Sequence, residues 1–565
     1  MSVYVGIHDG HNASVAVVRD GRVTLALQEE RLTRVKNQGD APAGAAGLAF
    51  HALNGRSGEV RFALNGLYMN YHQWERERIV TDYERSGDLM GRWKQPLKGT
   101  VLDRAYQKRK AELRAQALAR IGVEMARTEA VEHHLAHASA AYHTAPWRDE
   151  PVLVLTCDGS GDRLSATVNI GRQGELSRIA SVSEHDSIGR LYALVTRYLG
   201  MAPLEHEYKV MGLAPYVAPG RAGQAARDFS RLFEFSSDGL SWKRRTGVPP
   251  MYAAYPFVKK LLEGKRFDTI AAGAQKFIED MLVQWVTAAV RETGICKVAC
   301  AGGVFMNVKA NLALLEIPEV EDLYVFPSCG DESNSVGAAC HLSARAREPI
   351  EPLGALYYGE AINDGEAQLA LEAIAGRSVR IRWEHDIERV TAQKVAAGNI
   401  VARANGPMEF GARALGNRSI LARADSLSAV RVINEMIKNR DFWMPFAPSV
   451  LAGRAGEYYV KPKPVASPYM MFGFHSRPER REAFAAAQHP YDFTTRPHEV
   501  FEDHNPDYHR LLKEYEACTG EGIILNTSFN LHGEPIVYRA ADAVDVFLRS
   551  GLTAMALGNW WVEKR

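Results

Sequence analysis

Three short apolar segments of this chain each run directly into a turn rich in glycine and aspartate. They are Val152–Thr156, Lys297–Ala301 and Leu323–Phe326, followed by Asp158-Gly-Ser-Gly-Asp162, Gly302-Gly303 and Pro327-Ser-Cys-Gly-Asp331. Short apolar runs that end in such turns are typical of strands buried inside an α/β sheet, where ligands bind beyond the carboxyl ends of the strands. The pattern therefore predicts an α/β fold with candidate site residues directly after these strands.

The length of the chain requires more than one hydrophobic core. It has 565 residues, and a domain usually takes roughly 100–200. Hydrophobic residues make up 46% and charged residues 24%, which is typical of a folded globular protein. The proline-containing stretch 347–353 marks the main boundary. We expect one domain over 1–348, with a solvated helical insertion at about 70–127, and a second domain over 349–565.

Charge and cysteine content exclude several classes of protein. Lys and Arg number 68 against 67 Asp and Glu, for a formal charge of +1, so we expect no nucleic-acid partner and only local anion sites. The six scattered cysteines contain no CxxC pair, which suits a reducing compartment. No secretory signal is recognisable at the N-terminus, and no run reaches the about 18 apolar residues of a membrane span. We therefore expect a cytoplasmic protein without a membrane partner.

The segment Glu132-His-His-Leu-Ala-His137 carries two histidines four residues apart. In a helix, His133 and His137 lie on one face and can share a metal ion. The alternative is an ordinary pair of surface histidines. Asp158 and Asp331, each just past an apolar strand, would complete a mixed set of imidazole and carboxylate ligands. Such a set favours a divalent ion such as iron, manganese or zinc.

A second cluster lies in the last third of the chain, where cationic and amide side chains gather around glycine-containing turns. Its members are Arg413, Arg418, Lys438, Arg440, Arg496, Asn526, Ser528 and Asn530. Guanidinium forks, an ammonium group and short hydroxyl or amide donors are what phosphate oxygens require. Any one arginine could instead form a surface ion pair, but together these residues favour a phosphate pocket.

Four further residues have both a functional and a structural interpretation. Gly303 begins a turn that either packs tightly or brings backbone N–H groups close to a nucleotide, and Asn307 stands at the start of a helix. His11 lies in a loop between two strands expected at Val3–Ile7 and Ser14–Val18, and is either solvated or a general base. Lys36 is either a surface cation or a charge clamp on an acyl intermediate.

Eight motifs, in order over nearly the whole chain, resemble the O-carbamoyltransferases of the nodulation-protein and cephalosporin or aminoglycoside type. They are Gly10-His-Asn-Ala-Ser14, Glu29-Glu-Arg-Leu-Thr-Arg-Val-Lys36, His133-His-Leu-Ala-His137, Lys209-Val-Met-Gly-Leu-Ala-Pro-Tyr216, Gly302-Gly-Val-Phe-Met-Asn307, Glu409-Phe-Gly-Ala-Arg-Ala-Leu-Gly-Asn-Arg-Ser419, Pro445-Phe-Ala-Pro448 and Asn526-Thr-Ser-Phe-Asn530. The resemblance implies an N-terminal actin/hexokinase-like (ASKHA, TsaD-like) domain and a C-terminal YrdC-like α/β domain.

The resemblance also implies an activity. The C-terminal domain would use carbamoyl phosphate and ATP with magnesium to make carbamoyl adenylate, and the N-terminal domain would transfer the carbamoyl group to a hydroxyl of a small molecule, such as a secondary metabolite or glycan. Carried over by motif, the roles fall into three groups. His133, His137, Asp158 and Asp331 would bind the metal, for which the resemblance implies iron(II). Lys36, Gly303 and Asn307 would hold the adenylate, with His11 beside the acceptor. The phosphate cluster named above would hold carbamoyl phosphate and ATP. A homodimer is the oligomer that we would test for.

The chain departs from the family pattern at a few positions. Met444 and Pro407 stand where many relatives have arginine, which leaves fewer cations for phosphate, and Glu332-Ser-Asn-Ser-Val336 is more polar than the usual Ala/Gly-rich run, which could alter adenylate contacts. Three alternatives remain: threonylcarbamoyladenosine-type modification of tRNA, a nucleotide-binding sensor without turnover, and a small-molecule kinase. The even charge balance argues against the tRNA substrate.

Overall fold

The computed structural model describes residues 2–53, 59–67, 101–438 and 441–565, which form two compact units. The first unit comprises Met1–Glu29 and Asn37–Leu353, and the second comprises Glu30–Lys36 and Gly354–Arg565. The division after Leu353 falls a few residues beyond the boundary expected at 348/349. Of the insertion expected at about 70–127, residues 70–100 lie outside the described residues, and the remainder contains helix α5 (Val101–Arg120).

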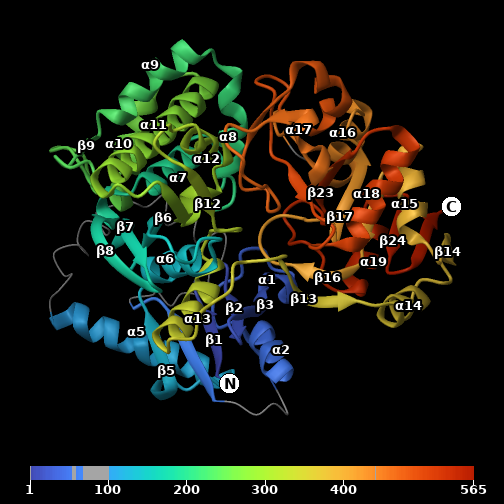
Figure 1. The fold of residues 1–565 in the computed structure, drawn as a ribbon, viewed down its shortest axis with the longest axis horizontal. Coiled ribbons are helices and arrows are strands. Elements are labelled where there is room, and N and C mark those ends of the chain that lie inside the picture. The colour runs from blue at the N-terminus through green and yellow to red at the C-terminus, as the bar shows by residue number, and fades with distance from the viewer. Residues whose placement is uncertain (1, 54–58, 68–100, 439–440) are drawn as a thin grey trace. The chain divides into compact units, whose positions relative to one another are not determined.

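The first unit contains two five-stranded sheets with the same strand order (Figure 1). The first runs β3-β2-β1-β4-β5 and the second β8-β7-β6-β11-β12. In each, the central strand (β1 or β6) is antiparallel to one neighbour and parallel to the other. This duplicated arrangement confirms the α/β class and the actin/hexokinase-like fold predicted for the N-terminal domain. The strands are β1 (Val3–His8), β2 (Ser14–Arg19), β3 (Arg22–Gln28), β4 (Val60–Asn65), β5 (Thr128–Val131), β6 (Val152–Gly161), β7 (Leu164–Arg172), β8 (Glu175–Ser183), β11 (Lys297–Ala301) and β12 (Asp322–Val325).

Two helices connect the sheets of this unit. Helix α13 (Ser333–Arg345) packs on β1, β2 and β4, helix α6 (His133–Thr144) packs on β6, β7 and β11, and the two helices pack against each other. Glycines permit this close approach, because a Cβ atom on Gly337 would lie 1.8 Å from the carbonyl oxygen of Ala136. A Cβ atom on Gly6 of β1 would lie 1.8 Å from the carbonyl oxygen of Ser335. Small residues thus bring the starts of α6 and α13 together.

The other elements of the first unit surround this centre. They are α2 (Ala43–Leu53), α7 (Ile188–Tyr198), α8 (Glu207–Leu213), α9 (Pro219–Ser230), β9 (Phe233–Phe235), β10 (Trp242–Arg244), α10 (Tyr255–Leu262), α11 (Phe267–Thr293) and α12 (Val308–Leu315). The long helix α11 packs against both α9 and α12.

The second unit is built on an eight-stranded mixed sheet, ordered β14-β25-β24-β15-β17-β23-β18-β22. Its strands are β14 (Val379–Trp383), β15 (Val401–Ala404), β17 (Arg418–Arg423), β18 (Ala447–Leu451), β22 (His498–Val500), β23 (Ile523–Ser528), β24 (Ala554–Leu557) and β25 (Trp560–Lys564). The strands of two smaller sheets are β13 (Tyr357–Ile362) and β16 (Gly406–Glu409), and β19 (Tyr459–Val460), β20 (Phe474–Ser476) and β21 (Thr494–Thr495). The helices are α14 (Asp364–Glu372), α15 (Ile387–Ala396), α16 (Leu427–Ile433), α17 (Ala455–Tyr458), α18 (Pro506–Thr519) and α19 (Ala540–Arg549).

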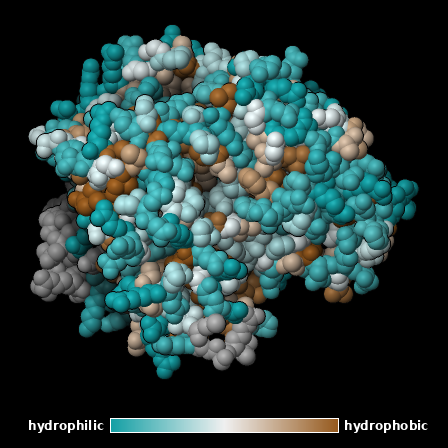
Figure 2. Space-filling view, in the orientation of Figure 1, coloured by the Kyte–Doolittle hydropathy of each residue, from teal (hydrophilic) through white to brown (hydrophobic). Residues whose placement is uncertain are grey.

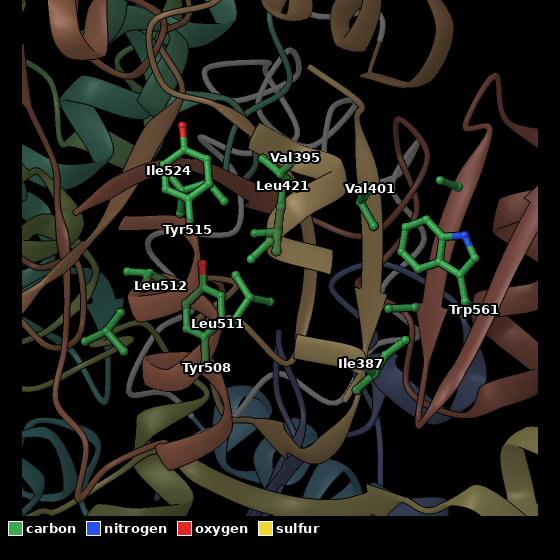
Figure 3. Packing of buried hydrophobic residues seen from close by; sticks show 14 of the residues in the cluster. Ile387, Val395, Val401, Leu421, Tyr508, Leu511, Leu512, Tyr515, Ile524 and Trp561 are labelled. Atoms are coloured by element: carbon green, nitrogen blue, oxygen red, sulfur yellow. The ribbon is translucent and has the colours of Figure 1, made fainter. Parts of the chain in front are cut away.

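The core of this unit lies between the sheet and two helices that pack against each other, α15 and α18 (Figure 3). Tyr508, Leu511 and Tyr515 of α18 lie in one cluster with Ile387 of α15 and with Trp561 of β25. Burial of such large apolar and aromatic side chains is the dominant stabilising contribution to a sheet of this size.

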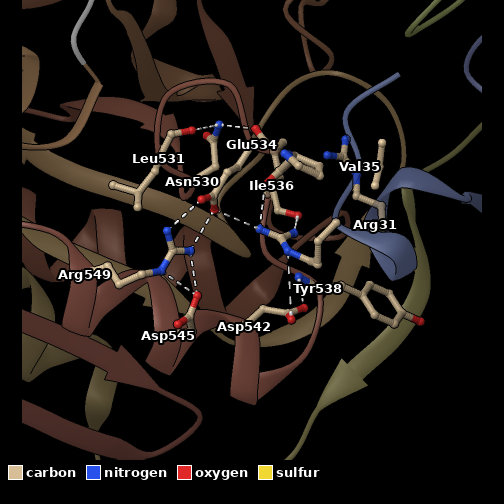
Figure 4. A network of polar contacts seen from close by, with 12 residues as sticks. Arg31, Val35, Asn530, Leu531, Glu534, Ile536, Tyr538, Asp542, Asp545 and Arg549 are labelled. Carbon is tan, nitrogen blue, oxygen red and sulfur yellow. Dashed lines mark hydrogen bonds and ion pairs between the residues drawn. The ribbon is translucent and has the colours of Figure 1, made fainter. Parts of the chain in front are cut away.

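A short segment from the N-terminal part of the sequence belongs to the second unit. Helix α1 (Glu30–Thr33) and the residues to Lys36 are held there by arginines. Arg31 donates to the carbonyl oxygen of Gly411 at 2.5 Å, and Arg34 donates to the carbonyls of Pro535 and Ile536 at 2.9 and 2.6 Å. Figure 4 shows this network together with the neighbouring Glu534 and Arg549. Lys36, which the motif assigned to the transfer domain, therefore groups with the second unit.

One expected strand is several residues longer in the structure. The strand expected to end at Thr156 continues to Gly161, because β7 pairs with it as a hairpin, and Asp158 therefore lies within a strand instead of after it. In the second unit, helix α16 ends as an α-helix at Ile433 and continues as one π-helical turn, Asn434–Lys438. This turn widens the helix just before Lys438.

Figure 2 shows a mainly hydrophilic face with hydrophobic residues scattered over it. The most exposed large apolar side chains of the described residues include Phe442 and Leu369, which are 79% and 70% exposed. Within the described part of the chain, we find no helix whose length and hydropathy would let it cross a membrane.

Candidate metal centre and phosphate site

Helix α6 begins at His133 because nearby carboxylates accept hydrogen bonds from its first N–H groups. Glu132 accepts from the two N–H groups that follow His133, at 3.0 and 2.9 Å, and Asp162 accepts from the N–H of His133 at 2.8 Å. Negative side chains stabilise this end of a helix. The helix predicted for the HxxxH segment is confirmed, and the rings of His133 and His137 lie 4.8 Å apart, centroid to centroid.

Four side chains that are far apart in the sequence converge beside this helix. His133, His137, Asp158 and Asp331 each offer one ligand atom, and these atoms all lie within 4.8 Å of one another. The Nε2 atom of His133 is 3.3 Å from Asp158 and 3.5 Å from Asp331, and Nε2 of His137 is 3.6 Å from the same oxygen of Asp331. Ligand atoms bound at about 2.0–2.2 Å to one ion lie roughly 3–3.5 Å apart. The two nitrogens and two oxygens therefore fit one divalent ion.

The electrostatics of this cluster also favour a cation. Burial opposes ionisation of both carboxyl groups, and Asp158 opposes that of Asp331, but the imidazoles hold the pKa of each below its usual value. Burial would lower the pKa of His133, but the carboxylates of Asp331 and Asp158 raise it to about 9. Two carboxylates thus stay ionised in a buried site, where a divalent cation can neutralise both.

Two glycines lie against the candidate metal ligands. The backbone N–H of Gly303 donates to Asp158 at 2.9 Å, and a Cβ atom on Gly303 would lie 2.7 Å from the same oxygen. A Cβ atom on Gly161 would lie 2.1 Å from the ring of His133. The structure therefore places Gly303, which we expected at the nucleotide, against a candidate metal ligand, and shows why position 161 has no side chain.

The loop that carries His11 is held by a residue that the sequence analysis missed. The carbonyl of His11 bonds to Nε2 of His8 at 2.9 Å, and Nδ1 of His8 bonds to the side-chain amide of Asn65 at 2.9 Å. Burial lowers the pKa of His8 to about 4 although Asp331 raises it, so His8 stays neutral. The sequence could have indicated His8, because it lies beside the Gly10-His11 motif. It contains no comparable indication of Asn65, which lies at the end of β4.

Asn307 starts helix α12, as expected, and is also part of a buried amide network. Its side chain accepts from the N–H of Ala310 at 3.1 Å and forms two hydrogen bonds with the amide of Gln275, at 2.8 and 3.0 Å. The hydroxyl of Tyr192 donates to Gln275 at 2.9 Å. Gln275, which the sequence analysis missed, thus holds the Asn307 amide in one orientation.

In the second unit, Lys438 is the centre of a polar cluster. Its ammonium group donates to the carbonyls of Ser528 and Asn530 at 2.5 and 2.9 Å, and to their side-chain oxygens at 3.2 and 2.6 Å. Ser528 donates to Asn530 at 2.6 Å. Three of the predicted phosphate ligands therefore lie together at the end of β23.

The other predicted phosphate ligands differ in their surroundings. Asn526 donates to the carbonyl of Ala414 at 3.0 Å and to Ser449 at 2.9 Å. The fully buried Arg418 donates to the carbonyls of Asn405, Gly406, Asn417 and Tyr538, so most of its donors stabilise a turn. Arg413 and Arg496 are half-buried in loops of this unit, and Arg440 lies outside the described residues.

Comparison with known proteins decides the family. The model of the carbamoyltransferase N-terminus matches residues 4–340, and the model of the carbamoyltransferase C-terminus matches residues 392–564. The chain belongs to the carbamoyltransferase family. The resemblance inferred from the eight motifs is thereby confirmed, and so is the assignment of this carbamoyltransferase as an enzyme.

Relatives of this carbamoyltransferase occur in bacteria and archaea. Nodulation protein NolNO of Sinorhizobium fredii is 30% identical over 98% of this chain and 79% of its own. An uncharacterised protein of Methanocaldococcus jannaschii is 32% identical over 77% of this chain and 73% of its own. The crystal structure of full-length HypF in its phosphate- and nucleotide-bound form covers 60% of this chain and 55% of its own, with 13% identity and a TM-score of 0.32.

Proposed function

We propose that this carbamoyltransferase makes carbamoyl adenylate from carbamoyl phosphate and ATP in its second unit and transfers the carbamoyl group to a small-molecule hydroxyl in its first unit. One observation carries the proposal: the two units hold donor clusters of opposite character. Partly buried carboxylates and buried imidazoles beside α6 suit a divalent cation, whereas the cation and short polar side chains of the cluster around Lys438 are of the kinds that bind phosphate oxygens.

In the second unit, cations and short polar side chains hold carbamoyl phosphate and magnesium-bound ATP. The residues proposed for this are Arg413, Arg418, Lys438, Arg440, Arg496, Asn526, Ser528 and Asn530. Water releases phosphate from carbamoyl phosphate, and an oxygen of the resulting carbamate attacks the α-phosphorus of ATP, so that pyrophosphate leaves. The second unit would thus have the YrdC-like role that the motifs imply. Lys36, which groups with this unit, is proposed to contact the adenylate phosphate there.

In the first unit, Gly303 and Asn307 hold the adenylate and His11 accepts the proton of the acceptor hydroxyl. The hydroxyl oxygen attacks the carbamoyl carbon, and AMP leaves with the bonding electron pair. His133, His137, Asp158 and Asp331 would hold a divalent ion, iron(II) before manganese or zinc, which supplies stabilisation of the negative charge that develops during transfer. Neutral His8 keeps the His11 loop in place.

We propose a secondary metabolite or glycan as the acceptor, and a cytoplasmic location, which the six free cysteines support. Transfer to tRNA is the alternative in the same fold class, and the charge balance of 68 against 67 argues against it.

The test measures the two half-reactions separately in the full-length protein. We expect pyrophosphate release from ATP only when carbamoyl phosphate is present. Lys438→Ala should abolish this release, because it removes the central cation of the phosphate site. His133→Ala should preserve it and lower carbamate formation by about 10²-fold or more. Carbamates are detected by mass spectrometry after incubation with hydroxylated antibiotic, nucleoside and glycan cores.

Matched controls come from exposed residues of the same type. Lys513→Ala in the second unit and His51→Ala in the first should leave both half-reactions unchanged. Pyrophosphate release that does not depend on carbamoyl phosphate would refute the adenylate. Equal loss of both half-reactions in His133→Ala would refute two separate sites.

A further inference from the structure

The segment after Asp331 is unusually polar, and two of its side chains contact a metal ligand. The hydroxyl of Ser333 lies 3.2 Å from Nδ1 of His137, and the side-chain nitrogen of Asn334 lies 3.2 Å from Nε2. All three side chains are completely buried. Consecutive residues of one helix start therefore contact both nitrogens of the same imidazole.

These two contacts determine which nitrogen of His137 carries the hydrogen. An amide nitrogen only donates hydrogen bonds, so Nε2 of His137 accepts from Asn334 and has no hydrogen. In a neutral imidazole the hydrogen is then on Nδ1, which donates to the hydroxyl oxygen of Ser333. Nε2 is also the atom that faces Asp331, at 3.6 Å. The nitrogen without a hydrogen thus points toward the other candidate ligands.

We propose that Ser333 is a positioning residue of the metal centre: it fixes the Nδ1–H tautomer of His137, so that Nε2 is the atom that binds the ion. Asn334 holds the same ring from the opposite nitrogen when the site is metal-free, and gives up this hydrogen bond when the ion binds. The inference rests on the metal centre of the proposed function. It needs neither ATP nor an acceptor, so it can be tested even if the carbamoyl chemistry proves different.

Residues other than Ser333 hold the ring of His133, so loss of the Ser333 hydroxyl should act on His137 alone. The ring of His133 packs against Gly161, and its Nε2 pairs with Asp158 at 3.3 Å. The hydroxyl of Ser335, two residues after Ser333, contacts Ser14 at 2.8 Å and the carbonyl of Glu332. Neither of these partners is a candidate metal ligand. Loss of the Ser333 hydroxyl should therefore affect His137, and loss of the Ser335 hydroxyl should not.

The experiment measures the dissociation constants of the full-length protein for Mn²⁺ and Co²⁺, by competition with chelators and by the visible spectrum of bound Co²⁺. Removal of a group that orients a metal-binding histidine typically weakens binding about 10–100-fold, and we expect this for Ser333→Ala. Ser333→Thr, which keeps the hydroxyl, should restore most of the affinity. Ser335→Ala is the matched control and should bind like the unsubstituted protein.

Two results would overturn the inference: wild-type affinity in Ser333→Ala, or an equal loss in Ser335→Ala. A second measurement does not depend on the folding of a Ser333 variant. In metal-free protein with ¹⁵N-labelled histidine, the signals that disappear in His137→Ala should be those of a protonated Nδ1 and an unprotonated Nε2. The reverse pattern would show that Ser333 does not set the tautomer.

Discussion

Arg114 of helix α5 and Asp9 at the end of strand β1 form a buried ion pair with two hydrogen bonds, Nε to Oδ2 at 2.7 Å and Nη2 to Oδ1 at 2.8 Å. The same guanidinium donates to the carbonyls of Asn65 and Gly66 at 2.5 and 2.7 Å. Asp9 directly follows His8, and the side chain of Asn65 bonds to His8. Arg114 therefore links helix α5 to the two residues that support the His11 loop, His8 and Asn65.

Arg114→Met should therefore destabilise the first unit strongly, because it leaves Asp9 buried without a cation. Breaking a buried pair in this way costs about 3–5 kcal/mol. We expect the free energy needed to open β1 and α5 to fall by about this amount, as measured by native-state hydrogen exchange. Arg120→Met, at an exposed position of the same helix, is the control and should change little. Unchanged exchange in β1 would contradict the proposed link between insertion and loop.

Gly337→Ala should separate the two helices that carry or follow the candidate metal ligands. Its Cβ atom would lie 1.8 Å from the carbonyl oxygen of Ala136, a backbone atom that cannot rotate away. Overpacking of a core typically costs about 1–3 kcal/mol. We expect a lower unfolding temperature and weaker Mn²⁺ binding. The control is Gly223→Ala in helix α9, which has open space around it and should be neutral or stabilising.

Stability of the metal-free protein should depend on pH through His133. Because carboxylates raise its folded-state pKa from 6.5 to about 9, the protonated ring stabilises the fold fully below pH 6.5, and this contribution is lost as the pH rises to about 9. Asp158 has a lowered pKa, so its contribution is present above its usual pKa of 3.8 and is lost in acid. Thermal unfolding of chelator-treated protein should thus show a decline between pH 6.5 and 9.

The same proton links metal binding to pH. An ion must displace it from His133, so the affinity should rise with pH up to about 9, and binding at pH 7 should release protons. Calorimetry in buffers of different ionisation enthalpy measures this release. Metal-saturated protein should lack the decline in stability, and an equal decline with and without metal would argue against His133 as a ligand.

Arg34→Ala should release the segment Glu30–Lys36 from the second unit. Arg34 donates to the carbonyls of Ile536 and Pro535, and hydrogen bonds from a charged group contribute about 1.5–3 kcal/mol each. We expect faster tryptic cleavage after Lys36, read by mass spectrometry. Arg549→Ala removes a more exposed arginine that pairs with Glu534 in the same network, and should have a much smaller effect. Equal cleavage in both variants would contradict a specific role of Arg34.

Much of the first site could be predicted from local sequence. The spacing of His133 and His137 determines a shared helix face, and the apolar runs before Asp158 and Asp331 determine buried strands. The four residues meet in the structure as these patterns indicate. The phosphate site was less predictable: Lys438, Ser528 and Asn530 come together, but Arg418 spends most of its donors on backbone carbonyls. Composition reveals that an arginine is near a turn, but not which acceptors the turn presents to it.

The sequence by itself determined the α/β class, the family and the candidate metal ligands, because apolar periodicity, turn residues and ligand spacing act over a few neighbouring residues. Only the tertiary structure decided that Ser333 contacts His137, that Arg114 neutralises Asp9, and that Lys36 belongs to the second unit. Ser333 and His137 lie 196 positions apart in the sequence, and Arg114 and Asp9 lie 105 positions apart. Lys36 groups with a unit whose other residues begin at Gly354. The partners in these contacts are chosen by burial and by the need to satisfy every buried polar group, which no local pattern encodes.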